Sequence, residues 1–94
     1  TTIVMNNKSW GAEKAYQKDF FGKRYLGADI TSPSFDKVAE LYGAKGFKVK
    51  KISEICEAVR AAIKSNKPSV IDVDVDPKAL YSFRRDSFKH RVKK

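Results

Sequence analysis

The sequence predicts an α/β fold, a partial three-layer sandwich with a mostly parallel sheet. Short apolar runs typical of strands alternate with segments of helical spacing, in the order strand, helix, helix, strand, helix, strand. Helical crossovers between strands make a parallel sheet the expected arrangement. The chain has 94 residues, of which 41% are hydrophobic and 33% charged, and this is the size and composition of one small folded domain.

The first strand is expected at Thr2–Asn6, where Ile3-Val4-Met5 forms a continuous apolar run typical of a buried strand. Turn-forming residues follow at positions 6–9. A short helix is expected over residues 10–20, and a loop without clear periodicity over residues 21–32. Because the chain opens directly on a strand, we expect it to be a fragment of a longer protein.

The middle of the chain predicts two helices separated by a strand. Ser32-Pro33 indicates the start of the first helix, since Ser can cap it and Pro fits its first position, and Gly43 indicates its end. Phe47 and Val49 mark the strand, and Ser53 can cap the second helix. The apolar positions expected at helical spacing are Phe35, Val38, Ala39, Leu41 and Tyr42 in the first helix, and Ile55, Val59, Ala62 and Ile63 in the second.

The last strand is expected over residues 70–75, where apolar residues alternate with Asp72, Asp74 and Asp76. We interpret the aspartates as the polar face of a half-exposed strand. They resemble the start of a calcium loop, but that loop requires Gly and a carboxylate where Pro77 and Phe83 stand. The sequence therefore predicts no calcium site here.

Other common chemistries are excluded by composition. Cys56 is the only cysteine, so no internal disulfide can form; we expect it to be a buried thiol, and the lack of disulfides fits a cytoplasmic protein. His90 is the only histidine, which rules out a Ser-His-Asp triad or a His-rich metal site within the chain. There is neither a phosphate-binding glycine loop nor an apolar run long enough to span a membrane.

Charge divides the chain into a body, residues 1–77, and a basic C-terminal tail, residues 78–94. The net charge of +9 is concentrated in the tail, where seven basic residues and one acidic residue give +6. One interpretation is a solvated tail that packs on a neighbouring domain or subunit. The other is an anion site for phosphate, a nucleotide-like group or nucleic acid.

The polar turn after the first strand is the strongest candidate for a site. Ligands of open α/β sheets bind at the carboxyl ends of the strands, and Asn6-Asn7 follows such an end. Amide and turn carbonyl oxygens suit magnesium, and a helix starting just afterwards directs its N-terminal dipole towards a phosphate. Glu13, in the first turn of that helix, could transfer protons.

These residues resemble a known family. A strand followed by Asn6-Asn7 is similar to the closing half of the signature by which thiamine-diphosphate enzymes bind magnesium diphosphate; its opening Gly-Asp-Gly is absent here. The resemblance to the C-terminal thiamine-diphosphate-binding domain covers nearly the whole chain. Within the family, similarity to the sulfoacetaldehyde acetyltransferases rests on Trp10-Gly11-Ala12-Glu13-Lys14, Gln17, Asp19-Phe20, Gly43-Ala44, Gly46 and Phe83-Arg84-Arg85-Asp86.

The resemblance implies a role for each matching residue. Asn7 would bind Mg²⁺ through its side-chain oxygen and Ser9 through its backbone carbonyl. Trp10 and Gly11 would shape the wall beside thiamine diphosphate, and Glu13 matches a position where some decarboxylases of this family place an active-site carboxylate. The basic pair Arg84 and Arg85 would bind sulfonate or phosphate; an inter-subunit or inter-domain salt bridge is the alternative.

The implied parent enzyme converts sulfoacetaldehyde and phosphate to acetyl phosphate and sulfite, as part of taurine metabolism. In this family the active site lies between domains of different subunits, so a homodimer or homotetramer is expected. The chain's partners would be small anionic substrates and the remainder of its own enzyme chain, with no membrane involved. The first magnesium ligand and the domain that activates the cofactor are absent, so we expect the 94 residues alone to be inactive.

Two alternatives stay open. Another thiamine-diphosphate enzyme, an acetolactate synthase or a 2-oxoacid decarboxylase, would share the fold and the metal ligands. A small basic nucleic-acid-binding domain is the alternative from another class, based on the charge of the tail and its aromatic residues Tyr81, Phe83 and Phe88. We do not expect nucleic-acid binding, because those aromatic residues form no recognisable RNA-binding motif.

Overall fold

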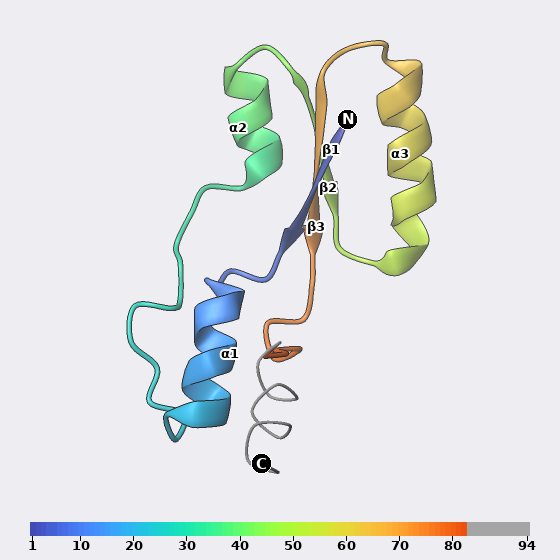
Figure 1. Ribbon diagram of the computed structural model, residues 1–94. Coiled ribbons are helices and arrows are strands. Elements are labelled where there is room, and N and C mark those ends of the chain that lie inside the picture. The colour runs from blue at the N-terminus through green and yellow to red at the C-terminus, as the bar shows by residue number, and fades with distance from the viewer. Residues whose placement is uncertain (83–94) are drawn as a thin grey trace, which may run out of the picture. The chain divides into compact units, whose positions relative to one another are not determined.

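The computed structural model describes residues 1–82 (Figure 1). Arg84, Arg85 and His90, together with most of the basic tail, lie outside the described residues. The described residues separate into two compact units, one formed by Thr1–Asn7 and Thr31–Asp76, the other by residues 8–30 and 77–82. The predicted division at residue 77 stays a prediction.

The first unit is a parallel sheet with a helix on each face. Its elements are β1 (Thr2–Asn6), α2 (Phe35–Leu41), β2 (Lys45–Val49), the 3-10 turn η1 (Ile52–Glu54), α3 (Ile55–Lys64) and β3 (Ser69–Asp74). The strand order is β1-β3-β2 and both pairings are parallel. The expected α/β class with its parallel sheet is confirmed, and so are the three strands to within two residues.

The apolar core lies between α3 and the sheet. Val49, Ala62, Ile71 and Val73 are buried there, and partly buried apolar side chains surround them. Figure 1 shows α2 on the opposite side of the sheet from α3. β3 is therefore covered on both faces, as expected for the central strand of a parallel sheet.

The packing of α2 on the sheet depends on Gly46 in β2. A Cβ atom at Gly46 would overlap the carbonyl oxygen of Asp36 and would lie 2.7 Å from its carbonyl carbon and 2.9 Å from its Cα. These are backbone atoms in the first turn of the helix, so no side-chain rotation can relieve the overlap. Gly46 thus permits an approach of helix to strand that any other residue would prevent.

β1 forms as predicted, but the expectation that it is buried was wrong. Ile3 is 46% exposed and Met5 is 63% exposed. β1 lies at the edge of the described sheet, where β3 is its only neighbour. The helix on that face, α3, packs against β2 and β3 instead.

Both helix starts differ from the prediction. α2 begins at Phe35 rather than at Ser32-Pro33, because the Phe35 amide donates to a buried carboxylate on β3 and Ser34 precedes it in an extended conformation. Ser53 lies inside η1, and Glu54 is the residue before α3. The predicted end of α2 is confirmed, since Gly43 has a left-handed φ of 79°.

Three side chains expected on buried helix faces are exposed. Leu41 and Tyr42 lie at the end of α2, and Ile63 lies on α3 beside the buried Ala62. Cys56, expected to be a buried thiol, is exposed as well. Ala62 is the buried residue of α3, and Ile55, Ala58 and Val59 are partly buried beside it.

The second unit consists of α1 (Gly11–Phe20) and the loop that returns along it. The helix predicted over residues 10–20 is confirmed. The Gln17 side chain holds the loop at Leu26 with two hydrogen bonds: its Nε2 donates to the Leu26 carbonyl at 3.0 Å, and its Oε1 accepts from the Leu26 amide at 3.2 Å. Lys14 binds Asp29 at 2.6 Å and lies over the Tyr25 ring.

None of the helices in residues 1–82 combines the length and the apolarity needed to cross a membrane.

Candidate functional site

Asn7 is half-buried and stands directly after the carboxyl end of β1. It is the last residue of the first unit, and Lys8 begins the second. Lys8 has a φ of 57°, in the left-handed region that β-carbon sterics disfavour for most residues. Lys8 separates the two proposed metal ligands, Asn7 and Ser9, along the chain.

Ser9 forms an isolated antiparallel bridge with Asp29. The two hydrogen bonds of the bridge come from the residues that flank it. The Trp10 amide donates to the Ala28 carbonyl at 2.7 Å, and the Ile30 amide donates to the Lys8 carbonyl at 3.0 Å. In such a pair the backbone groups of the central residue point away from the partner strand. The Ser9 carbonyl is therefore directed away from the Asp29 loop, as a metal ligand must be.

The N-terminus of α1 follows at once. The Trp10 carbonyl accepts the first helical hydrogen bond, from the Lys14 amide at 3.0 Å, and the Trp10 side chain makes no capping hydrogen bond. The first-turn amides and the helix dipole together favour an anion at this position. Gly11 is half-buried, while Trp10 and Glu13 are exposed.

The structure brings four of the candidate residues together in one unit: Ser9, Trp10, Gly11 and Glu13. Asn7 is joined to them through Lys8. The donor chemistry fits magnesium diphosphate, because an amide oxygen and a backbone carbonyl are hard neutral ligands and the helix start offers amides to phosphate oxygens. The other predicted pair, Arg84 and Arg85, lies outside the described residues.

Sequence reasoning missed a buried charge on β3. Asp72, expected on a half-exposed face, is 0% exposed. One of its oxygens, Oδ2, accepts every hydrogen bond found for this carboxylate: from the Phe35 amide at 2.9 Å, the Ser34 hydroxyl at 3.2 Å and the Asn6 side-chain amide at 3.5 Å. Lys48 Nζ lies 3.2 Å from the same oxygen. Within residues 1–82, the other oxygen, Oδ1, has no hydrogen-bond partner.

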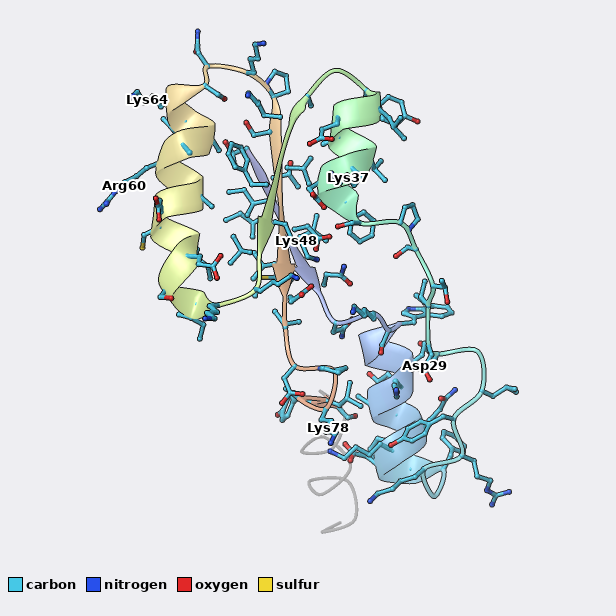
Figure 2. The ribbon with its side chains drawn as sticks, turned by 180° about the vertical axis from the view of Figure 1, so that it is seen from behind. Asp29, Lys37, Lys48, Arg60, Lys64 and Lys78 are labelled. Atoms are coloured by element: carbon cyan, nitrogen blue, oxygen red, sulfur yellow. The ribbon has the colours of Figure 1, made fainter. Side chains whose placement is uncertain are left out.

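Lys48 supplies the positive charge. In Figure 2 it lies over the sheet, whereas Arg60 on α3 points away from it. Its Nζ also binds Asp74 at 2.7 Å. The hydrogen bond to Asp74 is the main cause that raises the pKa of Lys48; burial opposes the shift and Asp72 adds to it.

Asp72 is held ionised by its neighbours. Burial is the largest single influence on its pKa and would raise it, but the Phe35 amide, Asn6 and Lys48 together outweigh burial, so the pKa lies below its ordinary value. We call Asn6, Ser34, Phe35, Lys48 and Asp72 the Asp72 cluster.

A signal for this cluster exists in the sequence. The middle strand of a parallel sheet is covered on both faces, so an aspartate there requires buried partners. Lys48 stands between the apolar Phe47 and Val49, and the register places it directly opposite Asp72. Recognising β3 as the central strand would have been enough to pair the two.

Comparisons with known proteins identify the family of the chain. The sequence model of the family described as "Thiamine pyrophosphate enzyme, C-terminal TPP binding domain" matches residues 1–73, and thiamine pyrophosphate is thiamine diphosphate. The chain is 34% identical over 97 residues to the sulfoacetaldehyde acetyltransferase of Alcaligenes xylosoxydans xylosoxydans, and 33% identical over the same length to that of Castellaniella defragrans. Each alignment covers 99% of this chain and 16% of the relative.

A second group of relatives is about as similar in identity. The probable acetolactate synthase large subunit of Methanococcus aeolicus is 32% identical over 80 residues, which is 84% of this chain and 13% of that protein. The chain thus spans only about a sixth of the length of the curated relatives that it matches. Since the family model matches residues 1–73, which is most of the chain, the chain belongs to the family of C-terminal thiamine-diphosphate-binding domains of thiamine-diphosphate enzymes.

Proposed function

We propose that this chain is the C-terminal part of a thiamine-diphosphate-dependent acyltransferase that converts sulfoacetaldehyde and phosphate to acetyl phosphate and sulfite. The observation that carries the proposal is the extent of similarity. Relatives named as sulfoacetaldehyde acetyltransferases match over 99% of the chain, whereas the first of the acetolactate synthases matches over 84%. The polar turn after β1 supplies the chemistry that such an enzyme requires.

In this proposal the turn holds the cofactor through a magnesium ion. Asn7 binds Mg²⁺ with its side-chain oxygen and Ser9 with its backbone carbonyl, while the start of α1 faces the diphosphate. Trp10 and Gly11 lie beside the cofactor, where a glycine lets the backbone approach closely. Once bound, thiamine diphosphate supplies a nucleophilic carbon for attack on an aldehyde, and the protein supplies position and electrostatics.

Glu13 is the proposed proton carrier. It is exposed in the first turn of α1, so its carboxylate can reach a substrate bound beyond the helix start. Arg84 and Arg85 are the proposed contacts for the anionic sulfonate and phosphate groups, because guanidinium binds both with two parallel hydrogen bonds. The Arg proposal rests on sequence alone.

The proposed enzyme requires parts outside this chain. Two neutral ligands cannot hold magnesium diphosphate tightly, so the first metal ligand and the second active-site domain come from the remainder of the enzyme. We propose a cytoplasmic homodimer or homotetramer in taurine metabolism, and we expect the 94 residues alone to be inactive. The short share of the relatives' length that the chain spans supports this view.

The test uses the full enzyme. We expect it to form acetyl phosphate from sulfoacetaldehyde and phosphate only when thiamine diphosphate and Mg²⁺ are present. Asn7→Ala should raise the Mg²⁺ concentration for half-maximal activity by at least about tenfold, whereas Asn7→Asp keeps an oxygen ligand and should stay closer to wild type. Normal Mg²⁺ dependence in Asn7→Ala would remove Asn7 from the metal site.

The same assay decides between the two candidate substrates. Acetolactate synthase is the second candidate because relatives of that name are about as similar in identity. Formation of acetolactate from pyruvate, without acetyl phosphate formation from sulfoacetaldehyde, would establish it. In either case the cofactor site in this chain is the same.

A further inference from the structure

The carboxylate of Asp72 accepts hydrogen bonds from residues on both sides of the 8–30 segment. The chain leaves the sheet unit after Asn7, forms the unit of residues 8–30, and returns at Thr31. Asn6 stands immediately before the departure, while Ser34 and Phe35 follow the return. All three donate to the same Asp72 oxygen. A single buried atom therefore connects the two ends of the segment that carries most of the candidate cofactor residues.

The two ends are held unequally. On the returning side the Phe35 amide donates at 2.9 Å, and the Ser34 hydroxyl, whose proton Asp36 Oδ1 also accepts, lies at 3.2 Å. On the departing side the Asn6 side chain lies at 3.5 Å, and the Asn6 carbonyl accepts a further hydrogen bond from the Val75 amide at 3.1 Å. Loss of the carboxylate should therefore release the returning side more than the departing side.

The negative charge of Asp72 strengthens these hydrogen bonds. A hydrogen bond to an ionised acceptor is about twice as strong as a neutral one, and Asp72 is completely buried, so water does not compete for it. Lys48, on the neighbouring strand, adds a positive charge 3.2 Å from the same oxygen. Asp74 also binds Lys48, whereas the hydrogen bonds of Ser34 and Phe35 to β3 go to Asp72, which makes Asp74 a matched control on the same strand.

We propose that Asp72 is a positioning residue for the cofactor site: it fastens both connections of the 8–30 segment to the sheet and so sets the place of Asn7. The role of Asn7 rests on the proposed function, whereas the fastening itself does not. Because Asp72 is completely buried, it acts through Asn6 and the start of α2.

Hydrogen exchange of the full enzyme without cofactor tests the fastening. In Asp72→Leu, amides at Phe35 and in peptides covering residues 31–35 should exchange about ten- to a hundredfold faster, and those at residues 6–9 should accelerate less. Asp74→Asn should leave both regions within about twofold of wild type. Asp72→Asn can keep an oxygen at the position of Oδ2 without its charge, so its rates should lie between those of wild type and Asp72→Leu.

A milder variant keeps the test decisive if Asp72→Leu does not fold. Ser34→Ala removes the hydroxyl, which contacts both Asp72 and Asp36, and should accelerate exchange at residues 31–35 by severalfold. Exchange in Asp72→Asn and Ser34→Ala equal to that in Asp74→Asn would overturn the fastening.

Binding then tests the consequence for Asn7. The Kd for thiamine diphosphate with Mg²⁺ should rise by about tenfold in Asp72→Asn and stay unchanged in Asp74→Asn. Faster exchange with an unchanged Kd would overturn the positioning role. If the wild-type enzyme binds no thiamine diphosphate, the proposed function fails, and the exchange rates still decide whether Asp72 fastens the segment.

Discussion

Replacing Gly46 with alanine should destabilise the sheet unit severely. The added Cβ would overlap the Asp36 carbonyl oxygen and lie 2.7 Å and 2.9 Å from the carbonyl carbon and Cα of that residue, whereas Cβ atoms essentially never come within 3.0 Å of other heavy atoms. All three are helix backbone atoms, so α2 must move as a body. Overpacking of this kind costs about 1–3 kcal/mol.

The displacement of α2 has a second cost. The helix starts at Phe35, whose amide donates to buried Asp72 at 2.9 Å, and a movement large enough to relieve the overlap lengthens that bond. Weakening a hydrogen bond to a buried charge adds about 1.5–3 kcal/mol, while the lower entropy of the unfolded alanine chain returns about 0.4–1 kcal/mol. The net loss is about 2–5 kcal/mol, a large part of the stability of a domain of this size.

Thermal unfolding followed by circular dichroism measures this loss. For a domain of this size, a loss of 2–5 kcal/mol should lower the Tm by roughly 10–30 °C. Gly43→Ala is the matched control: its φ of 79° makes alanine strained, but no described atom lies within 4 Å of the added Cβ, so the cost should be about 1–2 kcal/mol. A Tm for Gly46→Ala equal to or above that of Gly43→Ala would refute the close-packing argument.

Two further predictions concern the buried charge and the exposed thiol. Lys48→Met leaves Asp72 ionised and buried without its cation and should cost about 3 kcal/mol in urea unfolding, whereas Met at the exposed Lys50 should change little; equal effects would contradict the pairing. The free energy of unfolding of the wild type should be highest on a plateau between the ordinary pKa values of the pair, 3.8 and 10.5. The folded pKa of Asp72 is lowered, so its contribution is lost as the pH falls through that folded pKa. The folded pKa of Lys48 is raised, so its contribution is lost as the pH rises through the folded pKa of Lys48. A maximum outside this window would show that other groups dominate. Cys56 should react with Ellman's reagent in the native chain at nearly the rate found in urea, and strong protection would show that its side chain is covered.

Local patterns predicted the elements well. Alternation of apolar runs with helical spacing indicated the three strands and the three helices, and Gly43 marked the end of α2 because its left-handed φ is a property of the residue itself. The Asn6-Asn7 turn was identified as the candidate cofactor site from its position after a strand. The inferences on the strands, the helices and Gly43 succeeded because each depends on neighbours within a few residues along the chain, while the cofactor site stays a prediction.

The failures concern residues whose surroundings come from distant parts of the chain. Ser32-Pro33 is a good local start for a helix, yet α2 begins at Phe35, because the Phe35 amide donates to the Asp72 carboxylate, 37 residues away in the sequence. Ile3 and Met5 form an apolar run, yet β1 lies at the edge of the described sheet and both are exposed. Which strand is central cannot be seen in any one segment.

By itself, the sequence determined the α/β class, the order of the elements and the position of the polar turn, because periodicity and turn chemistry are local. Only the tertiary structure decided that β3 is the middle strand. That placement buries Asp72, pairs it with Lys48 across the register, and lets one carboxylate bind Asn6 and Phe35, which are far apart in sequence. The reason is physical: the environment of a charge is set by what the whole fold places around it, and no local pattern encodes that.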